Sequence, residues 1–180
     1  MSDRSHVLLV VVDVQERMMP AIADHETVLS NILKLIEGCH VLGIPMLVTE
    51  QYPKGLGQTV PQVREAMDDW YTPIEKMSFS ACGEFAFMNN VETSGRGTII
   101  LCGVEAHICI SQTAHDLRNL GYTVEVTADA VGSRTEANYR IAMDRMARHG
   151  IGITSVETVL FELMDSADIP EFKAVQAIVK

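Results

Sequence analysis

Short apolar runs alternate along the chain with longer segments in which apolar residues recur at helical spacing. Residues 7–12 form an unbroken apolar run, which is typical of a parallel strand buried on both faces. From residue 24 onward the periodicity is helical, and Gly43 ends that pattern. Its apolar positions are Val28, Ile32, Leu35, Ile36, Cys39 and Leu42. The chain is therefore predicted to open with a strand followed by an amphipathic helix.

The same alternation continues to the end of the chain. Further strands are predicted at residues 44–49, 73–77, 98–101, 123–127 and 151–154, and helices at residues 61–67, 84–91, 136–149 and 170–179. Another helix begins near Cys109, and one more begins at Ser155 with Glu157 in its first turn. In the helix at 136–149 we expect Ile141, Met143 and Met146 to face inward. Strands that alternate with helices imply a parallel sheet covered on both faces.

Composition narrows the class of protein. A length of 180 residues fits one domain, residues 1–180, and 47% hydrophobic residues without a spanning run argue against disorder and membrane insertion. The formal net charge of −10 argues against nucleic acid as a partner. The cysteines (Cys39, Cys82, Cys102, Cys109) lack CxxC spacing, and the N-terminus shows no secretory pattern. We therefore expect a cytoplasmic protein with reduced thiols.

Five polar residues share one placement along the chain. Asp13, Glu50, Lys76, Cys109 and Asp129 each lie at the end of a predicted strand or just after it. In open parallel sheets the binding site lies at the carboxyl ends of the strands. We therefore group these residues as candidates for a single site.

Cys109 has the placement of a reactive thiol. The strand at 98–101 is predicted to stop at Gly103, where the backbone is free to turn, and Cys109 follows near a helix start. The positive end of a helix favours thiolate over thiol, and its unpaired N–H groups suit an oxyanion. The alternative is that Cys109 is a small buried hydrophobic residue, as most free cysteines are.

A thiol hydrolase also needs a group that accepts and returns a proton. None of the six histidines is a clear candidate, since His107 is two residues from Cys109 and such neighbours face different ways on a helix. Asp13 is then the candidate proton acceptor, and Lys76 would stabilise the charged forms of both partners. The alternatives are that Asp13 caps a turn and that Lys76 is a solvated surface residue.

The motifs around these residues resemble a known family. Asp13 in Asp-Val-Gln, Lys76 in Glu-Lys-Met-Ser-Phe-Ser, and Cys109 in Gly-Val-Glu-Ala-His-Ile-Cys together resemble the isochorismatase-like cysteine hydrolases. The stretches Asp-Val-Gln-Glu-Arg, Thr-Glu-Gln-Tyr-Pro-Lys-Gly-Leu-Gly and Pro-Glu-Phe-Lys-Ala-Val-Gln are similar to the isochorismatase-domain-containing subgroup. The resemblance implies a three-layer α/β/α Rossmann-like sandwich with a six-stranded parallel sheet, an Asp-Lys-Cys catalytic triad and a homo-oligomer, a dimer or larger.

The resemblance further implies how the triad would work. A non-proline cis peptide between Val104 and Glu105 would turn the N–H of Glu105 toward the N–H of Cys109, and the two would form an oxyanion hole. Asp13 would take the thiol proton, Cys109 would attack an amide carbonyl, and water would release the acyl group. We expect the Glu105 side chain to be an exposed carboxylate whose backbone alone contributes.

The resemblance also bears on metal and substrate. Nicotinamidases of the superfamily carry an Asp/His/His metal site after the second strand, whereas residues 50–57 contain no histidine. We therefore expect no metal and no other cofactor, and a small-molecule substrate other than nicotinamide. Candidate substrate-binding residues are Gln15, Gln51, Tyr52, Phe79 and His107. Gln15 is also placed to orient Asp13 or a loop, and Phe79 is equally suited to core packing.

Two other functions fit the same residues. The fold could be a catalytically silent oligomeric interaction scaffold, with ten methionines and apolar terminal helices supplying subunit interfaces. Alternatively, Cys109 could act as a redox-sensing thiol. A specific disulfide with a second cysteine would distinguish redox sensing from hydrolysis.

Overall fold

One sheet organises the part of the chain that the structure, a computed structural model, describes, which is residues 3–180. Its strands are β1 (Val7–Val12), β2 (Met46–Gln51), β3 (Ile74–Lys76), β4 (Thr98–Val104), β5 (Thr123–Gly132) and β6 (Gly152–Thr154). Their order is β3-β2-β1-β4-β5-β6, and every neighbouring pair is parallel. The predicted six-stranded parallel sheet is therefore confirmed.

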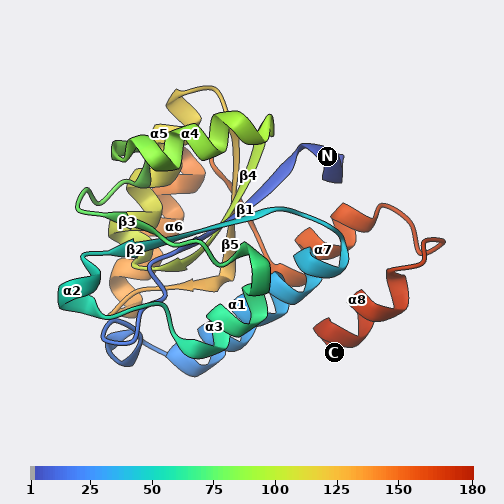
Figure 1. The fold of residues 1–180 in the computed structure, drawn as a ribbon, viewed down its shortest axis with the longest axis horizontal. Coiled ribbons are helices and arrows are strands. Elements are labelled where there is room, and N and C mark those ends of the chain that lie inside the picture. The colour runs from blue at the N-terminus through green and yellow to red at the C-terminus, as the bar shows by residue number, and fades with distance from the viewer. Residues whose placement is uncertain (1–2) are drawn as a thin grey trace.

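Helices cover both faces of this sheet (Figure 1). One face carries α1 (His25–Val41), α3 (Pro61–Met67), α7 (Val156–Met164) and α8 (Phe172–Val179), and the other carries α4 (Phe85–Ser94), α5 (Ser111–Asn119) and α6 (Glu136–Arg148). A short α2 (Pro53–Leu56) lies in the loop after β2. The three-layer α/β/α sandwich is thus confirmed.

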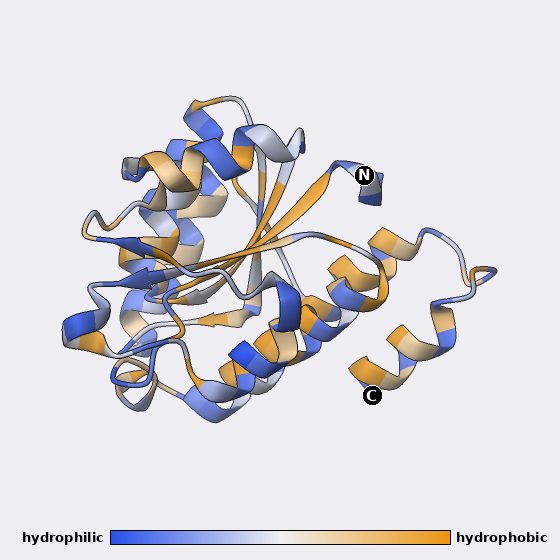
Figure 2. Cartoon of the chain, in the orientation of Figure 1, coloured by the Kyte–Doolittle hydropathy of each residue, from blue (hydrophilic) through white to orange (hydrophobic). Residues whose placement is uncertain are grey.

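The β1 side chains show why the central strands are apolar throughout. Leu9 and Val11 belong to the core under α1, whereas Leu8 and Val10 belong to the core under α4, α5 and α6. Because successive side chains of a strand point to opposite faces, a strand covered on both sides needs an unbroken apolar run. Figure 2 shows hydrophobic residues along the central strands and a mixture of hydrophobic and hydrophilic residues along the helices around them.

The helices follow the predicted pattern with one correction. All six apolar positions predicted for α1 are buried, and the Ser155 side chain caps α7 by accepting from the N–H of Thr158. In α6, however, Ile141 is 64% exposed, so its predicted inward orientation is wrong. The buried stripe runs instead through Ala142 and Met146, with Met143 partly buried against it. The prediction therefore holds for Met146 and in part for Met143, and Ala142 takes the inward place assigned to Ile141.

Three strands extend beyond their predicted ends, and β2 does so by two residues, to Gln51. β4 continues through Gly103 to Val104, and β5 continues to Gly132 after a register shift opposite residues 101–103. Gly103 does not end the strand but lets it approach β1. A Cβ at this position would lie 2.1 Å from the backbone oxygen of Val12, and its φ of +121° suits glycine alone. Close contact between the ends of β1 and β4 therefore depends on this glycine.

We expect Gly103→Ala to lower the free energy of unfolding by at least about 3 kcal/mol, because it combines a backbone clash with an unfavourable φ. Gly95→Ala is the matched control, since Gly95 has a φ of +66° and no heavy atom within 4 Å of an added Cβ. It should cost only about 1–2 kcal/mol. Urea unfolding measures both variants, and equal losses would contradict the proposed close approach.

Candidate active site

Asp13 lies just after β1, at the point where the strand order reverses. Chain segments that leave β1 and β4 go to opposite faces of the sheet, and in open parallel sheets ligands bind near such a switch point. Asp13 adopts a φ of 55°, a conformation that aspartate tolerates better than most residues. Its carboxylate is fully buried, and the Thr49 hydroxyl donates to Oδ1 at 2.7 Å. The end of β2 thus fixes the carboxylate that follows β1.

Lys76 reaches the same carboxylate from β3, two strands away. Two strand spacings amount to about 10 Å, a gap that a long lysine side chain helps to bridge. Its Nζ lies 2.7 Å from Asp13 Oδ2, with both side chains fully buried. Its hydrogen bonds go to three neutral oxygens: Gln51 Oε1 at 2.7 Å, Phe79 O at 3.1 Å and Ser78 O at 3.3 Å. The contact with Asp13 is therefore ionic, and Oδ2 receives no aligned hydrogen bond from the described residues.

Cys109 lies in a π-helical turn, Ala106–Ile110, that leads into α5, close to the predicted helix start. Its side chain is buried, and burial is the main reason that the pKa of the thiol is raised to about 12. The charge of Asp13 raises this pKa further, and the charge of Lys76 lowers it. The prediction that the helix start would favour a thiolate is therefore wrong for the resting protein, because burial and Asp13 outweigh Lys76.

Gln15 and Gln51, both predicted to bind substrate, are hydrogen-bonded within the protein. The Gln15 Nε2 donates to the backbone oxygens of Gln51 and Gly57 at 3.0 and 2.7 Å, and its Oε1 accepts from the Gln51 N–H at 2.7 Å. The Gln51 Nε2 donates to Met77 O at 3.0 Å, while its Oε1 accepts from Lys76. These two amides link the loops that follow β1, β2 and β3.

The Glu105 side chain is buried, which corrects the prediction of an exposed carboxylate. Its Oε1 lies 2.6 Å from Arg134 Nε, and its Oε2 accepts from the Arg134 N–H at 3.2 Å. His107 Nδ1 lies 3.3 Å from the same Oε2 and 3.0 Å from Ser133 Oγ. A buried carboxylate needs such partners, so the loop before α6 supplies them. Glu105 and His107 thereby tie the Cys109 turn to that loop.

The predicted cis peptide between Val104 and Glu105 is not present, since residues 3–180 contain no cis peptide bond. A non-proline cis bond costs about 3 kcal/mol, and the chain enters the π-helical turn without it. Glu105 stays extended, with φ −65° and ψ 112°. The predicted two-donor oxyanion hole relied on that bond, so Glu105 loses its assigned role and the N–H of Cys109 is left as the candidate donor.

Tyr52 and Phe79 are largely exposed at the edge of the same region. Tyr52 is 47% exposed and Phe79 is 55% exposed, so Phe79 does not pack in the core. A cavity of about 300 Å³ borders Lys76 here, lined by Tyr52, Pro53, Lys54, Glu75, Lys76, Met77 and Glu84. Among the predicted substrate-binding residues, Tyr52 thus borders a cavity that also reaches Lys76, whereas Asp13 and Cys109 do not line it.

Glu50 and Asp129, grouped with the site by sequence, have other partners. Glu50 Oε1 accepts from the N–H and hydroxyl of Thr59 at 2.7 and 2.8 Å and from the Tyr71 hydroxyl at 2.9 Å. Asp129 Oδ1 accepts from the N–H of Val156 at 2.9 Å, at the start of α7. Both carboxylates therefore hold loops or helix ends in place.

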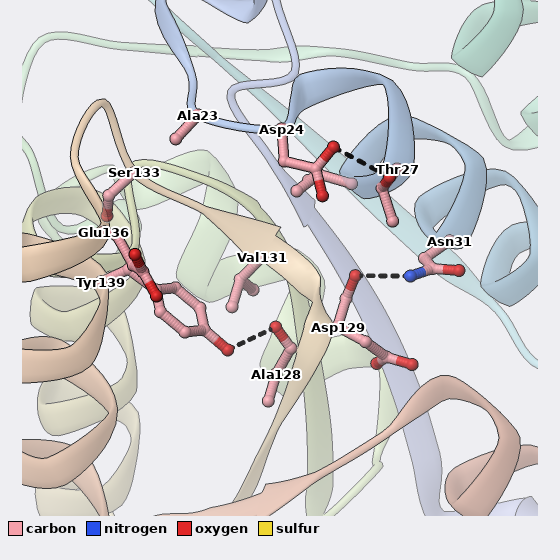
Figure 3. Close-up of a pocket in the computed structure, with 11 residues that line it drawn as sticks. Ala23, Asp24, Thr27, Asn31, Ala128, Asp129, Val131, Ser133, Glu136 and Tyr139 are labelled. Carbon is pink, nitrogen blue, oxygen red and sulfur yellow. Dashed lines mark hydrogen bonds between the residues drawn. The ribbon is translucent and has the colours of Figure 1, made fainter.

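Asp129 also borders a separate pocket of about 380 Å³ between α1, β5 and α6, shown in Figure 3. In this pocket Asn31 donates to Asp129 O, and the Tyr139 hydroxyl donates to Ala128 O, both at 2.8 Å. β6 pairs with β5 only up to Thr127. The backbone oxygens of Ala128 and Asp129 lie beyond this pairing, and they accept hydrogen bonds from the Tyr139 and Asn31 side chains instead. None of the residues that line the pocket belongs to the Asp13, Lys76 and Cys109 group.

Two contributors to the site were not predicted from the sequence. Thr49 pairs with Val12 in the β1–β2 register. A threonine hydroxyl within the strand Met46–Gln51 is the feature of the sequence that could have indicated this role. Glu84 Oε1 accepts from Met77 N–H, Ser78 N–H and Ser78 Oγ, and these hydrogen bonds lower the pKa of its carboxyl. Glu84 thereby holds the loop whose carbonyls bind Lys76, and no sequence pattern marks that contact.

Within residues 3–180, no cluster of three or more histidine, cysteine, aspartate or glutamate side chains has a geometry suited to a metal ion. Over the same residues, no helix combines the length and the apolar character that crossing a membrane requires.

Comparison with known protein families shows to which of them the chain belongs. The model of the isochorismatase domain matches residues 7–158. The chain belongs to the isochorismatase family. A relative named isochorismatase domain-containing protein 2, from Danio rerio, is 38% identical over 178 residues, which cover 99% of this chain and 88% of the relative. Family membership supports a hydrolase function, and the sequence resemblance to this family and subgroup is confirmed.

Two solved structures share the fold of this chain. The MAR1 ribonuclease from Caenorhabditis elegans superposes with a TM-score of 0.93 at 35% identity, over 99% of this chain and 91% of that one. YcaC from Escherichia coli, described as an octameric hydrolase of unknown specificity, superposes with a TM-score of 0.88 at 21% identity, over 98% of this chain and 94% of that one. At the latter identity the likeness concerns the fold.

We expect Lys76→Met to lower the free energy of unfolding by about 3–5 kcal/mol, because it leaves the buried Asp13 carboxylate without its cation. Arg148→Met is the matched control, since Arg148 pairs with Asp144 at 2.8 Å on an exposed helix surface. That change should cost no more than about 0.5 kcal/mol. Urea unfolding measures both losses, and similar values for the two variants would contradict a buried ion pair.

We expect Asp13→Asn to speed the alkylation of Cys109 by iodoacetamide at pH 8 by at least about tenfold. The negative charge of Asp13 raises the pKa of the thiol, so its removal lowers that pKa and increases the thiolate fraction. Mass spectrometry of the Cys109 peptide gives the rate, with Cys82 as the internal reference. Slower alkylation of the variant would show that Asp13 acts mainly by taking the thiol proton during attack and not through its effect on the thiol pKa.

Proposed function

We propose that this protein is a metal-independent cysteine hydrolase that cleaves the C–N bond of a small amide, with Asp13, Lys76 and Cys109 as its catalytic triad. The observation that carries the proposal is the buried ion pair of Asp13 and Lys76, at 2.7 Å, whose two charges both act on the pKa of the Cys109 thiol. Three side chains that follow different strands would then act together in one reaction.

Acylation begins with a neutral thiol. As the sulfur attacks the amide carbon, the thiol proton passes to Asp13 Oδ2, the oxygen that receives no aligned hydrogen bond. A C–S bond forms, and the carbonyl π electrons move to the oxygen, which the N–H of Cys109 stabilises. When the tetrahedral intermediate collapses, the C–N bond breaks and the leaving nitrogen takes the proton from Asp13. The product of this half is a thioester on Cys109 and a free amine.

Deacylation repeats these steps with water. Asp13 takes a proton from the water as its oxygen attacks the thioester carbon, and the C–S bond then breaks. The sulfur leaves and recovers a proton from Asp13, which restores the thiol and releases a carboxylic acid. The Lys76 ammonium stays charged throughout and balances the negative charge that moves between Asp13 and the carbonyl oxygen of the substrate.

The proposed substrate is small and reaches the triad without a metal. The cavity of about 300 Å³ beside Lys76, with Tyr52 at its border, has the volume of a small-molecule site. Residues 50–57 contain no histidine, the ligand that a nicotinamidase-type metal site needs at this loop. We therefore propose an amide other than nicotinamide.

RNA is a second candidate substrate because one similar structure is that of a ribonuclease. The formal net charge of −10 argues against RNA as the substrate, since affinity for nucleic acids comes mainly from lysine and arginine contacts with phosphates. We favour the amide for that reason.

We also propose a homo-oligomeric, cytoplasmic protein. The octameric assembly of the YcaC hydrolase, which shares the fold, supports a homo-oligomer. The four cysteines are all unpaired, which fits a reducing compartment.

Incubation of the intact protein with a library of small carboxamides should give an acyl adduct on Cys109, detected by mass spectrometry, and release of amine. Cys109→Ala should abolish both signals. Asp13→Asn should slow amine release by about 10²–10⁴-fold, because it removes the proton carrier.

Cys82→Ala is the matched control, because Cys82 lies outside the triad and its thiol contacts Thr113 O at 3.9 Å. It should leave the adduct and amine release unchanged. Absence of adduct and turnover across amides and esters would favour the catalytically silent scaffold. If the protein cleaves RNA and the Cys109→Ala variant does not, the ribonuclease hypothesis would be favoured.

A further inference from the structure

The Lys76 ammonium has no donor left for a substrate. An ammonium carries three N–H groups, and the oxygens of Gln51, Phe79 and Ser78 accept from Nζ at 2.7, 3.1 and 3.3 Å. Lys76 is fully buried as well. Its contribution to the site is therefore the position of its charge, which depends on the groups that hold Nζ.

Gln51 is the one side chain among these three acceptors. The Phe79 and Ser78 oxygens are backbone carbonyls of the loop that follows Lys76 itself, whereas Gln51 comes from the neighbouring strand. At 2.7 Å its hydrogen bond with Nζ is also the shortest of the three. A hydrogen bond that involves a charged group is stronger than one between neutral groups. Gln51 therefore has the best contact through which to set the direction of the ammonium.

The orientation of the Gln51 amide is itself fixed. Its Nε2 donates to Met77 O at 3.0 Å, so the opposite end, Oε1, must face Lys76. A flipped amide would bring its N–H₂ group against the ammonium and lose both hydrogen bonds. The Gln15 Oε1 holds the Gln51 N–H at 2.7 Å, and the Gln15 Nε2 bridges Gln51 O and Gly57 O. This arrangement fixes the backbone of Gln51 as well as its side chain.

A neutral acceptor suits this position better than a carboxylate. A second carboxylate beside Nζ would neutralise the charge that Lys76 directs at Asp13 and Cys109. An amide oxygen accepts the hydrogen bond without adding charge. The positive charge of Lys76 therefore acts on the Cys109 thiol without being neutralised by Gln51.

We propose that Gln51 is a positioning residue that acts through Lys76 and does not bind substrate, with Gln15 fixing the Gln51 backbone behind it. This inference rests on the proposed cysteine hydrolase and replaces the substrate-binding role predicted for both glutamines.

The test is the alkylation rate of Cys109 by iodoacetamide in the full-length protein, followed by mass spectrometry between pH 7 and pH 9. Gln51→Met keeps the shape of the side chain and removes its acceptor. It should slow alkylation by about tenfold at each pH, because the thiolate loses support from a well-placed ammonium. Gln62→Met, on the exposed surface of α3, is the matched control and should keep the wild-type rate.

A double-mutant cycle shows whether Gln51 acts through Lys76. In an Asp13→Asn/Lys76→Met background, which leaves neither charge of this pair buried alone, the added Gln51→Met should change the rate by less than about twofold. An equal slowing in both backgrounds would overturn the proposal, because Gln51 would then act on Cys109 independently of Lys76.

Other outcomes overturn the proposal in different ways. A wild-type rate for Gln51→Met would show that Gln51 does not position the ammonium. Faster alkylation together with a lower melting temperature would show that Gln51 only stabilises the fold, since a loosened site exposes Cys109. If no carboxamide acylates Cys109, the hydrolase proposal fails, yet the ratio of the alkylation rates still decides the role of Gln51.

Discussion

The ion pair of Asp13 and Lys76 is the interaction on which the arrangement at the carboxyl edge of the sheet depends. Burying a carboxylate and an ammonium is unfavourable unless they are close and their remaining polar atoms are satisfied. Here the Thr49 hydroxyl donates a hydrogen bond to the carboxylate, and the Gln51 side chain and two backbone carbonyls accept hydrogen bonds from the ammonium. The pair therefore recruits polar groups from β2 and from the loop after β3, and these fix the ends of three neighbouring strands relative to one another.

The Asp13–Lys76 ion pair also affects the pKa of the Cys109 thiol. A cysteine at a helix start usually gains thiolate character, but Cys109 is buried and faces a carboxylate as well as an ammonium. Burial and the carboxylate prevail, so the resting site holds a proton on sulfur and a charged acceptor beside it. Such an arrangement suits proton transfer during attack on a substrate.

A second buried carboxylate, Glu105, fixes the other side of the Cys109 turn. Its contacts with Arg134 and His107 join the turn to the loop that precedes α6. Gly103 contributes in the same region, because its missing side chain lets β4 lie against β1 before the turn begins. The turn that carries Cys109 is thus preceded by the Gly103 contact and joined to the loop before α6 through Glu105.

The sequence by itself determined the fold class, and it indicated Asp13, Lys76 and Cys109 as candidates for one site. Apolar runs and helical periodicity reflect burial, which is a local property of each segment, and strand ends followed by Asp13, Lys76 and Cys109 lie at the same edge of any parallel sheet. Only the tertiary structure decided the partners of each polar group. Glu50 and Asp129 share the strand-end placement, yet they bind Thr59 and Val156 and lie outside the triad. The same holds for Gln51 and Glu105, because a hydrogen bond or an ion pair depends on distances of about 3 Å between residues far apart in the chain.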